Sequence, residues 1–293
     1  MTTTTTTTTN IKTKTSTKLA VTGCLAAILG VFALGATTGA PEGAPEGAQI
    51  SPGPVAAEDD ECPPGEASAG MGPEMVRLPD GFCIDTTEVT RGQYRAWLET
   101  TPSTEGQPSA CAQNEDFEPS CAWPPPDHEA SYPVVCVDWC DARAYCEAAG
   151  KRLCGQIGGG GYDFDSYDDA SVSEWHAACT SGGEYDYTYG DALDTQICRG
   201  ADAEDYTTWG FVEVGTLPGC HSPVDAYSGV YDLSGNAAEW DNGCDGDTPD
   251  SPCRIRGGSF EFNDVGLRCA MAADLRWPRM RQVVSVGFRC CAD

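Results

Sequence analysis

The feature that most constrains this chain is its cysteines. Of 17 cysteines, Cys24 lies in an apolar stretch near the start, which leaves 17 − 1 = 16, an even number, spread from Cys62 to Cys291. No two of them form a C-x-x-C pair and the chain has three histidines, so a structural zinc site is not expected. In an exported protein this even count and wide spacing predict a disulfide framework.

The start of the chain has the parts of a secretory signal. Residues 1–18 are rich in Thr and carry three lysines, whereas residues 19–40 carry no charge and end in small residues. We therefore expect a signal peptide over residues 1–40. An uncleaved anchor is the alternative, because the apolar run is close to spanning length. Either way the protein is secreted, periplasmic or at the cell surface, and it contacts a membrane only if the segment stays uncleaved.

The charge of the chain excludes some partners. The formal net charge is -28, and without the three lysines of the leader 17 − 3 = 14 basic residues face 45 acidic ones, or 14 − 45 = -31. Such a surface repels phosphate backbones, so we expect no nucleic acid partner and no attraction to anionic membrane surfaces. Cations and basic peptides are favoured, although an acidic coat that serves solubility is an equally valid interpretation.

Residues 41–73 repeat Pro-Glu-Gly-Ala and lack the apolar content of a folded segment. We expect a disordered linker there, with Cys62 able to tie it to the domain. The folded domain is predicted to cover residues 74–293. Because its regular elements are short and few, the fold class is α/β (α+β) with little regular secondary structure, in which disulfides supply rigidity.

Short patterns predict the elements of this domain. Two strands flank a Pro-Asp-Gly turn at residues 79–81, and Thr90, Asp138 or Asp141, and the serines at 171–173 are typical N-terminal caps of helices. The second helix is expected to end at Ala149, before Gly150. Two further strands are predicted over residues 133–137 and 286–291.

The stretch from Gly229 to Trp240 concentrates small residues with an Asn and two carboxylates. Glycines let backbone carbonyls turn inward, and Asp232 and Glu239 add charged oxygens, which is the ligand set that calcium prefers. A Gly-rich turn with a solvated acidic face is the alternative. The acidic run Tyr162–Asp169 lacks the register of a calcium-binding EF-hand loop, so a solvated loop is favoured there.

A series of motifs in one order resembles the formylglycine-generating enzyme (sulfatase-modifying factor) family, over about residues 74–293. The motifs are Glu88-Val89-Thr90, Pro133-Val134-Val135, Gly150-Lys151-Arg152-Leu153, Gly229 to Asn236 with Glu239-Trp240, Arg256-Gly257-Gly258-Ser259-Phe260 and Gly287-Phe288-Arg289-Cys290. The resemblance implies a compact fold distantly related to C-type lectins and structural calcium. In active members it also implies oxidation of a sulfatase cysteine to formylglycine.

Several residues carry over by position. The resemblance implies a calcium site at Asp232, Gly235, Ala237 and Glu239, with Gly235 and Ala237 contributing backbone oxygens. A second family calcium site does not transfer, because Arg199 stands where an Asn is expected. The resemblance also implies two disulfides. These are Cys146–Cys290 and Cys179–Cys269. It assigns no partners to the other 12 cysteines.

The chain departs from the family where the oxidation takes place. Active members of the best-known type hold copper(I) on two cysteines just after the Arg-Gly-Gly-Ser motif, since a soft metal prefers thiolates. Here residues 260–268 contain neither Cys nor His, and Phe262 is nearest to the first cysteine position. Ala238 also replaces a usual Trp. Copper is therefore not expected as a cofactor.

Three functions remain open. The first is an exported, calcium-stabilised binder of a peptide or small molecule that lacks the copper cysteine pair. The second is an extracytoplasmic oxidoreductase that uses a different metal site, and the third is a surface carbohydrate-binding or adhesion module. Ser259 is the candidate catalytic residue of the cleft, with a merely packed serine as the alternative. The three histidines show no i, i+4 pair that would support an iron site.

Overall fold

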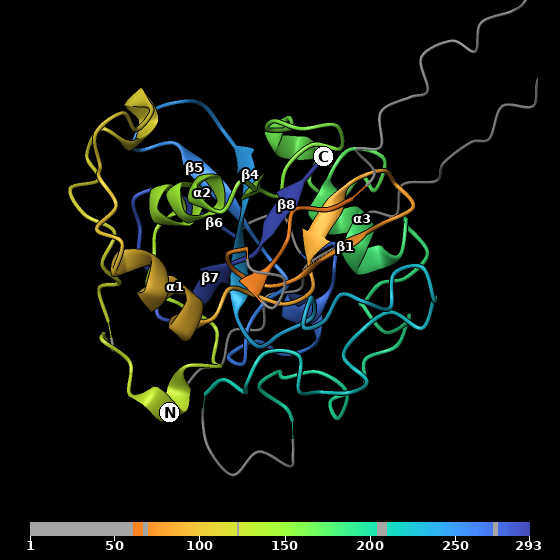
Figure 1. The fold of residues 1–293 in the computed structure, drawn as a ribbon. Helices are drawn as coiled ribbons and strands as arrows, with labels where there is room; N and C mark the ends of the chain where they lie inside the picture. The colour runs from red at the N-terminus through yellow and green to blue at the C-terminus, as the bar shows by residue number, and fades with distance from the viewer. Residues whose placement is uncertain (1–60, 67–69, 122, 204–209, 272–274) are drawn as a thin grey trace, which may run out of the picture. The chain divides into compact units, whose positions relative to one another are not determined.

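The computed structural model describes residues 61–66, 70–121, 123–203, 210–271 and 275–293 (Figure 1). By its contacts the chain divides into two units, Met1–Val55 and Ala56–Asp293, and all described residues belong to the second. The predicted signal peptide and most of the predicted linker lie outside the described residues. Within the described ranges no helix has the length and apolar character needed to span a bilayer.

The strands form two small sheets. The first has the order β1-β2-β8-β3 and is antiparallel throughout. Its strands are β1 Met75–Arg77, β2 Cys83–Asp85, β8 Cys290–Ala292 and β3 Arg152–Leu153. The second has the order β6-β5-β4-β7, with β4 and β7 parallel. Its strands are β6 Arg276–Pro278, β5 Pro252–Arg256, β4 Ala238–Cys244 and β7 Val286–Phe288.

The helices are short, as predicted for this fold class. The α-helices are α1 Arg91–Leu98, α2 Trp139–Ala148 and α3 Glu174–Thr180, and the 3₁₀ turns are η2 Ser109–Cys111, η3 Asp127–Glu129, η4 Phe164–Ser166 and η5 Asp264–Leu267. In Figure 1, α1 and α2 lie toward one side of the sheets and α3 toward the other.

Side-chain caps begin all three α-helices, which confirms the predicted helix starts. Thr90 and Asp138 each form a capping box. In it the cap side chain accepts a hydrogen bond from a backbone amide of the first turn, and the side chain of the third helical residue accepts one from the amide of the cap residue. Ser173 accepts from the amide of His176. Gly150, with φ 71°, follows α2 in the left-handed region that favours glycine.

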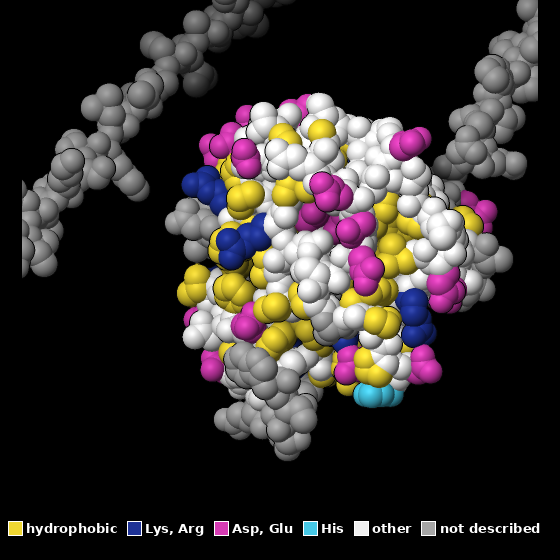
Figure 2. All heavy atoms as spheres, turned by 90° about the vertical axis from the view of Figure 1, so that its left-hand side faces the viewer, with side chains coloured by type: hydrophobic (Ala, Val, Ile, Leu, Met, Phe, Trp, Pro, Cys, Tyr) yellow, Lys and Arg dark blue, Asp and Glu magenta, His cyan; other side chains and the backbone are white. Residues whose placement is uncertain are grey.

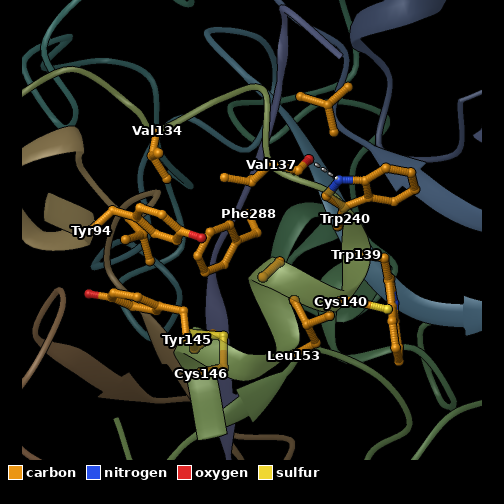
Figure 3. Packing of buried hydrophobic residues seen from close by; sticks show 14 of the residues in the cluster. Tyr94, Val134, Val137, Trp139, Cys140, Tyr145, Cys146, Leu153, Trp240 and Phe288 are labelled. Carbon is orange, nitrogen blue, oxygen red and sulfur yellow. Dashed lines mark hydrogen bonds between the residues drawn. A yellow bond between two sulfur atoms is a disulfide. The ribbon is translucent and has the colours of Figure 1, made fainter. Parts of the chain in front are cut away.

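The described residues form three hydrophobic clusters, and the two larger ones lie on opposite sides of β8. Successive residues of a strand point to opposite faces. Cys290 accordingly belongs to the cluster around Tyr94, Tyr145 and Phe288 (Figure 3), whereas Cys291 belongs to the cluster around α3. Each forms a disulfide within its own cluster, so β8 connects both halves of the core.

Two strand predictions need correction. Residues 133–137 form only an isolated bridge, between Thr90 and Pro133, because their amides bond to separate partners at Val89 and Val283 and not to one continuous strand. The predicted final strand is split at Arg289. Residues before Arg289 pair in the second sheet and residues after it pair in the first, so the chain crosses between the sheets at this position.

Part of the segment predicted as a linker packs on the domain. Cys62 is bonded to Cys83, and Lys151 Nζ donates to the carbonyl of Pro73 at 2.8 Å and to Asp85 Oδ1 at 2.6 Å. Lys151 and Asp85 are both buried. The folded unit therefore begins before residue 74, since these contacts hold residues 61–66 and 70–73 against β2 and β3.

Candidate functional site

The Gly-rich stretch before β4 is a series of turns held by a few contacts. Asp232 and Asn236 have φ of 64° and 57°, and Gly235 has φ 117°. A Cβ at Gly235 would lie 2.3 Å from the carbonyl oxygen of Arg199, so only glycine fits this close approach. The amide of Asn236 donates to that same carbonyl at 2.8 Å. This packing fixes the backbone on both sides of Asp232.

Glu239, a predicted calcium ligand, is held by an arginine and a tryptophan. Arg289 donates to both of its carboxylate oxygens, at 2.7 and 2.8 Å, and Trp175 Nε1 donates to Oε2 at 2.8 Å. Burial by itself lowers the pKa of Arg289, but Glu239 outweighs it and the pKa is raised. Both oxygens of Glu239 therefore already have donors, in a bidentate pair that is about 1% exposed on each side.

A second carboxylate, which sequence reasoning missed, faces Asp232. Glu88 Oε1 accepts from Asn236 Nδ2 at 3.0 Å, and Asp232 Oδ2 accepts from the amide of Gly215 at 2.6 Å. The other oxygens, Glu88 Oε2 and Asp232 Oδ1, are buried and accept from no donor outside the two carboxyl groups, which lie close enough for one to hydrogen-bond the other when one is protonated. Burial raises the pKa of Asp232 to about 6, and burial followed by the charge of Asp232 raises the pKa of Glu88 well above its usual value. We call Glu88, Asp232, Glu239 and Arg289 the acidic cluster.

The oxygen atoms of the acidic cluster supply some, but not all, of the ligands that a hard cation needs. Calcium takes six to eight oxygens from carboxylates and backbone carbonyls. The structure offers two carboxylate oxygens without another donor, one on Glu88 and one on Asp232, while those of Glu239 are engaged. The family motif Glu88-Val89-Thr90 contains Glu88, but no pattern in the neighbouring sequence indicates that Glu88 lies beside Asp232.

One other group of potential ligands lies close together in the described part of the chain, and it does not suit a metal. It consists of Cys154, Glu174 and Cys291. The two sulfurs are joined to each other in a disulfide, and Arg152 donates to both oxygens of Glu174 at 2.6 Å. These atoms are already occupied by covalent and ionic partners.

Ser259 has a structural environment. Its side chain is fully buried, and its Oγ accepts from the amide of Glu261 at 3.3 Å in the turn that follows β5. None of the five pockets found among the described residues is lined by Ser259. Nor does a described histidine hydrogen-bond to it, since His176 contacts Cys269 and Arg256 and His221 contacts Ser222. This geometry agrees with the packed-serine alternative.

The segment that carries the copper cysteines in active relatives is fastened by ordinary contacts. The hydroxyl of Tyr187 donates to Asp264, and Arg268 Nη1 donates to Asp186 at 2.9 Å. The carbonyl of Phe262 accepts from the amide of Ala201 at 2.8 Å. These contacts fasten the segment to residues 186, 187 and 201.

All 16 cysteines of the described residues are paired. The eight disulfides are Cys62–Cys83, Cys111–Cys140, Cys121–Cys136, Cys146–Cys290, Cys154–Cys291, Cys179–Cys269, Cys198–Cys220 and Cys244–Cys253. Two of them are the pairs that the resemblance implies. So many disulfides indicate an oxidising, extracytoplasmic compartment.

Comparison with known proteins identifies the family. Residues 36–293 match the FGE-sulfatase family, described as a sulfatase-modifying factor enzyme 1-like domain, and the chain belongs to this family. No curated protein matches the chain.

Among solved structures, the chain is similar to CarF with 19% identity and a TM-score of 0.47, over 76% of this chain and 96% of that one. It is also similar to PvdO from Pseudomonas aeruginosa, with 20% identity and a TM-score of 0.47 over 76% and 90% of the two chains. Variable protein 1 of Treponema denticola gives 17% identity and a TM-score of 0.42 over 76% and 93%.

Proposed function

We propose that this domain is a calcium-stabilised binding member of its family, which holds a peptide or small molecule and does not oxidise cysteine with copper. The observation that carries the proposal is the complete pairing of the described cysteines. Copper(I) is soft and selects thiolates. A sulfur already joined to another sulfur is not a thiolate, and residues 260–268 add no Cys or His.

The calcium part of the proposal is supported by the acidic cluster. Three carboxylates share one arginine, so the cluster has an excess of buried negative charge if all are ionised. Burying such charge without a partner is costly. A calcium ion held by Glu88 and Asp232, with backbone oxygens of Gly235 and Ala237, would remove that cost.

Copper and oxygen measurements test the binding proposal. We expect titration with copper(I) to show no tight stoichiometric site, and oxygen uptake with a cysteine-containing sulfatase peptide to stay at the level of the peptide with free copper. The reason is that no thiolate pair is available to bring the metal and the substrate thiol together.

The comparison variant is Phe262→Cys, which restores one of the two missing thiols and is measured under the same conditions. Tight binding of one copper(I) by the unmodified protein, together with turnover of the peptide, would show that the domain is an oxidase and would refute the proposal.

A further inference from the structure

A pocket lined by residues of α2 and of the end of β4 contains two guanidinium groups. Its cavity volume is about 310 Å3, and Trp139, Arg143, Asn242, Asp247 and Arg279 lie on its walls. Trp139 opens α2, Asn242 is in β4, and Arg279 follows β6 directly. We call this the arginine pocket.

Arg279 is buried without a close counter-ion. The residue is 2% exposed, and its Nη2 donates to the carbonyl of Gly246 at 2.7 Å. Its Nε has no hydrogen-bond partner. The carboxylate of Asp247 is 3.8 Å from Nη1, beyond hydrogen-bond distance, and its side chain is 85% exposed. Since a buried charge is costly unless it is closely paired, the loose ion pair with the exposed Asp247 offsets only part of the cost of burying Arg279.

Arg143 places a second cation beside the first. The guanidinium carbons of Arg279 and Arg143 lie 4.7 and 5.7 Å from the ring centre of Trp139. Arg143 is partly exposed, and its contact with Glu147 at 2.7 Å is a helix-surface pair that water screens. Of the five best-formed pockets compared in the described part of the chain, only this one has walls that carry more basic than acidic residues.

The rest of the molecule restricts which anion can enter. The net charge of the chain is -28, and acidic side chains are scattered over the face in Figure 2 while basic ones are few. This field repels polyanions more strongly than single charges. A guanidinium matches the planar geometry of a carboxylate. A ligand with one carboxylate is therefore the best fit.

We propose that the arginine pocket binds a single carboxylate, of a peptide C-terminus or of a small organic acid, with Arg279 Nη1 as the main donor and Arg143 at the rim. The incoming carboxylate takes the place of the distant Asp247. This inference rests on the proposed binding function and names the chemistry of its ligand. It concerns a different place from the acidic cluster and from the copper segment.

Calorimetry with two matched probes tests the inference. N-acetylglycine resembles a peptide C-terminus, and N-acetylglycinamide has the same shape without the charge. We expect the acid to bind with one-to-one stoichiometry and the amide not to bind. Acetate is the third probe: weaker binding of acetate than of N-acetylglycine assigns the site to peptide C-termini, and equal binding assigns it to small organic acids. Equal binding of the acid and the amide, or binding of neither, overturns the inference.

Three variants test which residues bind the carboxylate, so that the test does not depend on the folding of the Arg279 variant alone. Asp247→Asn removes the competing carboxylate, so it is expected to tighten binding of N-acetylglycine about two- to fivefold, the range of an exposed ion pair. Asp250→Asn makes the same charge change in the same loop, away from the pocket walls, and is expected to leave the affinity unchanged. Arg279→Gln should abolish binding, with its melting temperature as the check on folding. Equal affinities of the Asp247 and Asp250 variants would overturn the assignment, whatever the fold of the Arg279 variant.

Discussion

Removal of the Cys146–Cys290 and Cys154–Cys291 disulfides together, with all four residues changed to Ala, is expected to lower the free energy of unfolding by at least about 5 kcal/mol. These neighbouring bonds close nearly the same loop, of 144 and 137 residues, so either bond alone would keep it closed. In the chain-entropy account a longer loop constrains the unfolded chain more. Because small domains are stable by about 5–15 kcal/mol, such a loss leaves little of the total. Urea unfolding followed by tryptophan fluorescence measures it.

The matched control is the Cys244–Cys253 pair, which closes a loop of only 9 residues between β4 and β5. Its removal should cost about 3 kcal/mol by the same account. Cys290 also lies on the central strand of the first sheet, beside Cys291 of the opposite core, so its loss loosens contacts that the short bond does not reach. Equal losses for the double removal and for the short bond would show that loop length does not govern the stability of this domain.

Glu88→Gln is expected to have the second large effect, and its sign depends on calcium. Without calcium at pH 7.5, the variant should be more stable than the unmodified protein by about 1–3 kcal/mol. Burial raises the pKa of Glu88, so the folded protein must take up a proton that the unfolded chain has lost at this pH, whereas Gln needs no proton. With calcium in excess, the unmodified protein should gain about 3 kcal/mol at a hundredfold excess over the dissociation constant. The variant should gain little, having lost a ligand.

Melting temperatures in a chelator and in calcium, measured by scanning calorimetry, check both parts. Glu147→Gln, which removes an exposed carboxylate from α2, is the control and should respond to calcium as the unmodified protein does. If calcium leaves the melting temperature of the unmodified protein unchanged, the acidic cluster is not a calcium site.

The same cluster sets a pH dependence in the absence of calcium. The pKa of Asp232 is about 6 in the folded protein against an ordinary value of 3.8, so the folded state holds this proton more tightly than the unfolded chain. Stability is then highest near pH 4 and falls as the pH rises through 6. Burial also raises the pKa of Asp85 and of Asp241 to about 6, so these two groups change the stability in the same direction. Glu88→Gln should reduce the share of this pH dependence of stability that comes from the acidic cluster.

Local chemistry made much of the fold predictable. Thr90, Asp138 and Ser173 cap their helices through atoms within three residues, and Gly150 ends α2 with a left-handed conformation. Such signals are contained in a few neighbouring residues. The hairpin of β1 and β2 follows in the same way from its turn, because both strands are adjacent in the chain.

Long-range pairing decided what could not be predicted. Residues 133–137 have the composition of a strand, but no neighbouring strand forms a continuous ladder with them. Glu88 reaches Asn236, 148 residues further along, so no sequence window contains both. Arg289 lies where the chain crosses between the two sheets, and it also donates to both carboxylate oxygens of Glu239. These are oxygens that the sequence assigned to calcium. Twelve cysteines had no assignable partner for the same reason, since their spacing alone permits many pairings.

The most direct test of the account is a count of free thiols in the exported protein. Alkylation in denaturant without a reductant, followed by peptide mass spectrometry, should label none of the 16 cysteines from Cys62 to Cys291, and alkylation after reduction should label all of them. A pair of cysteines labelled without reduction would contradict the account, because it would supply the thiolates that copper(I) requires.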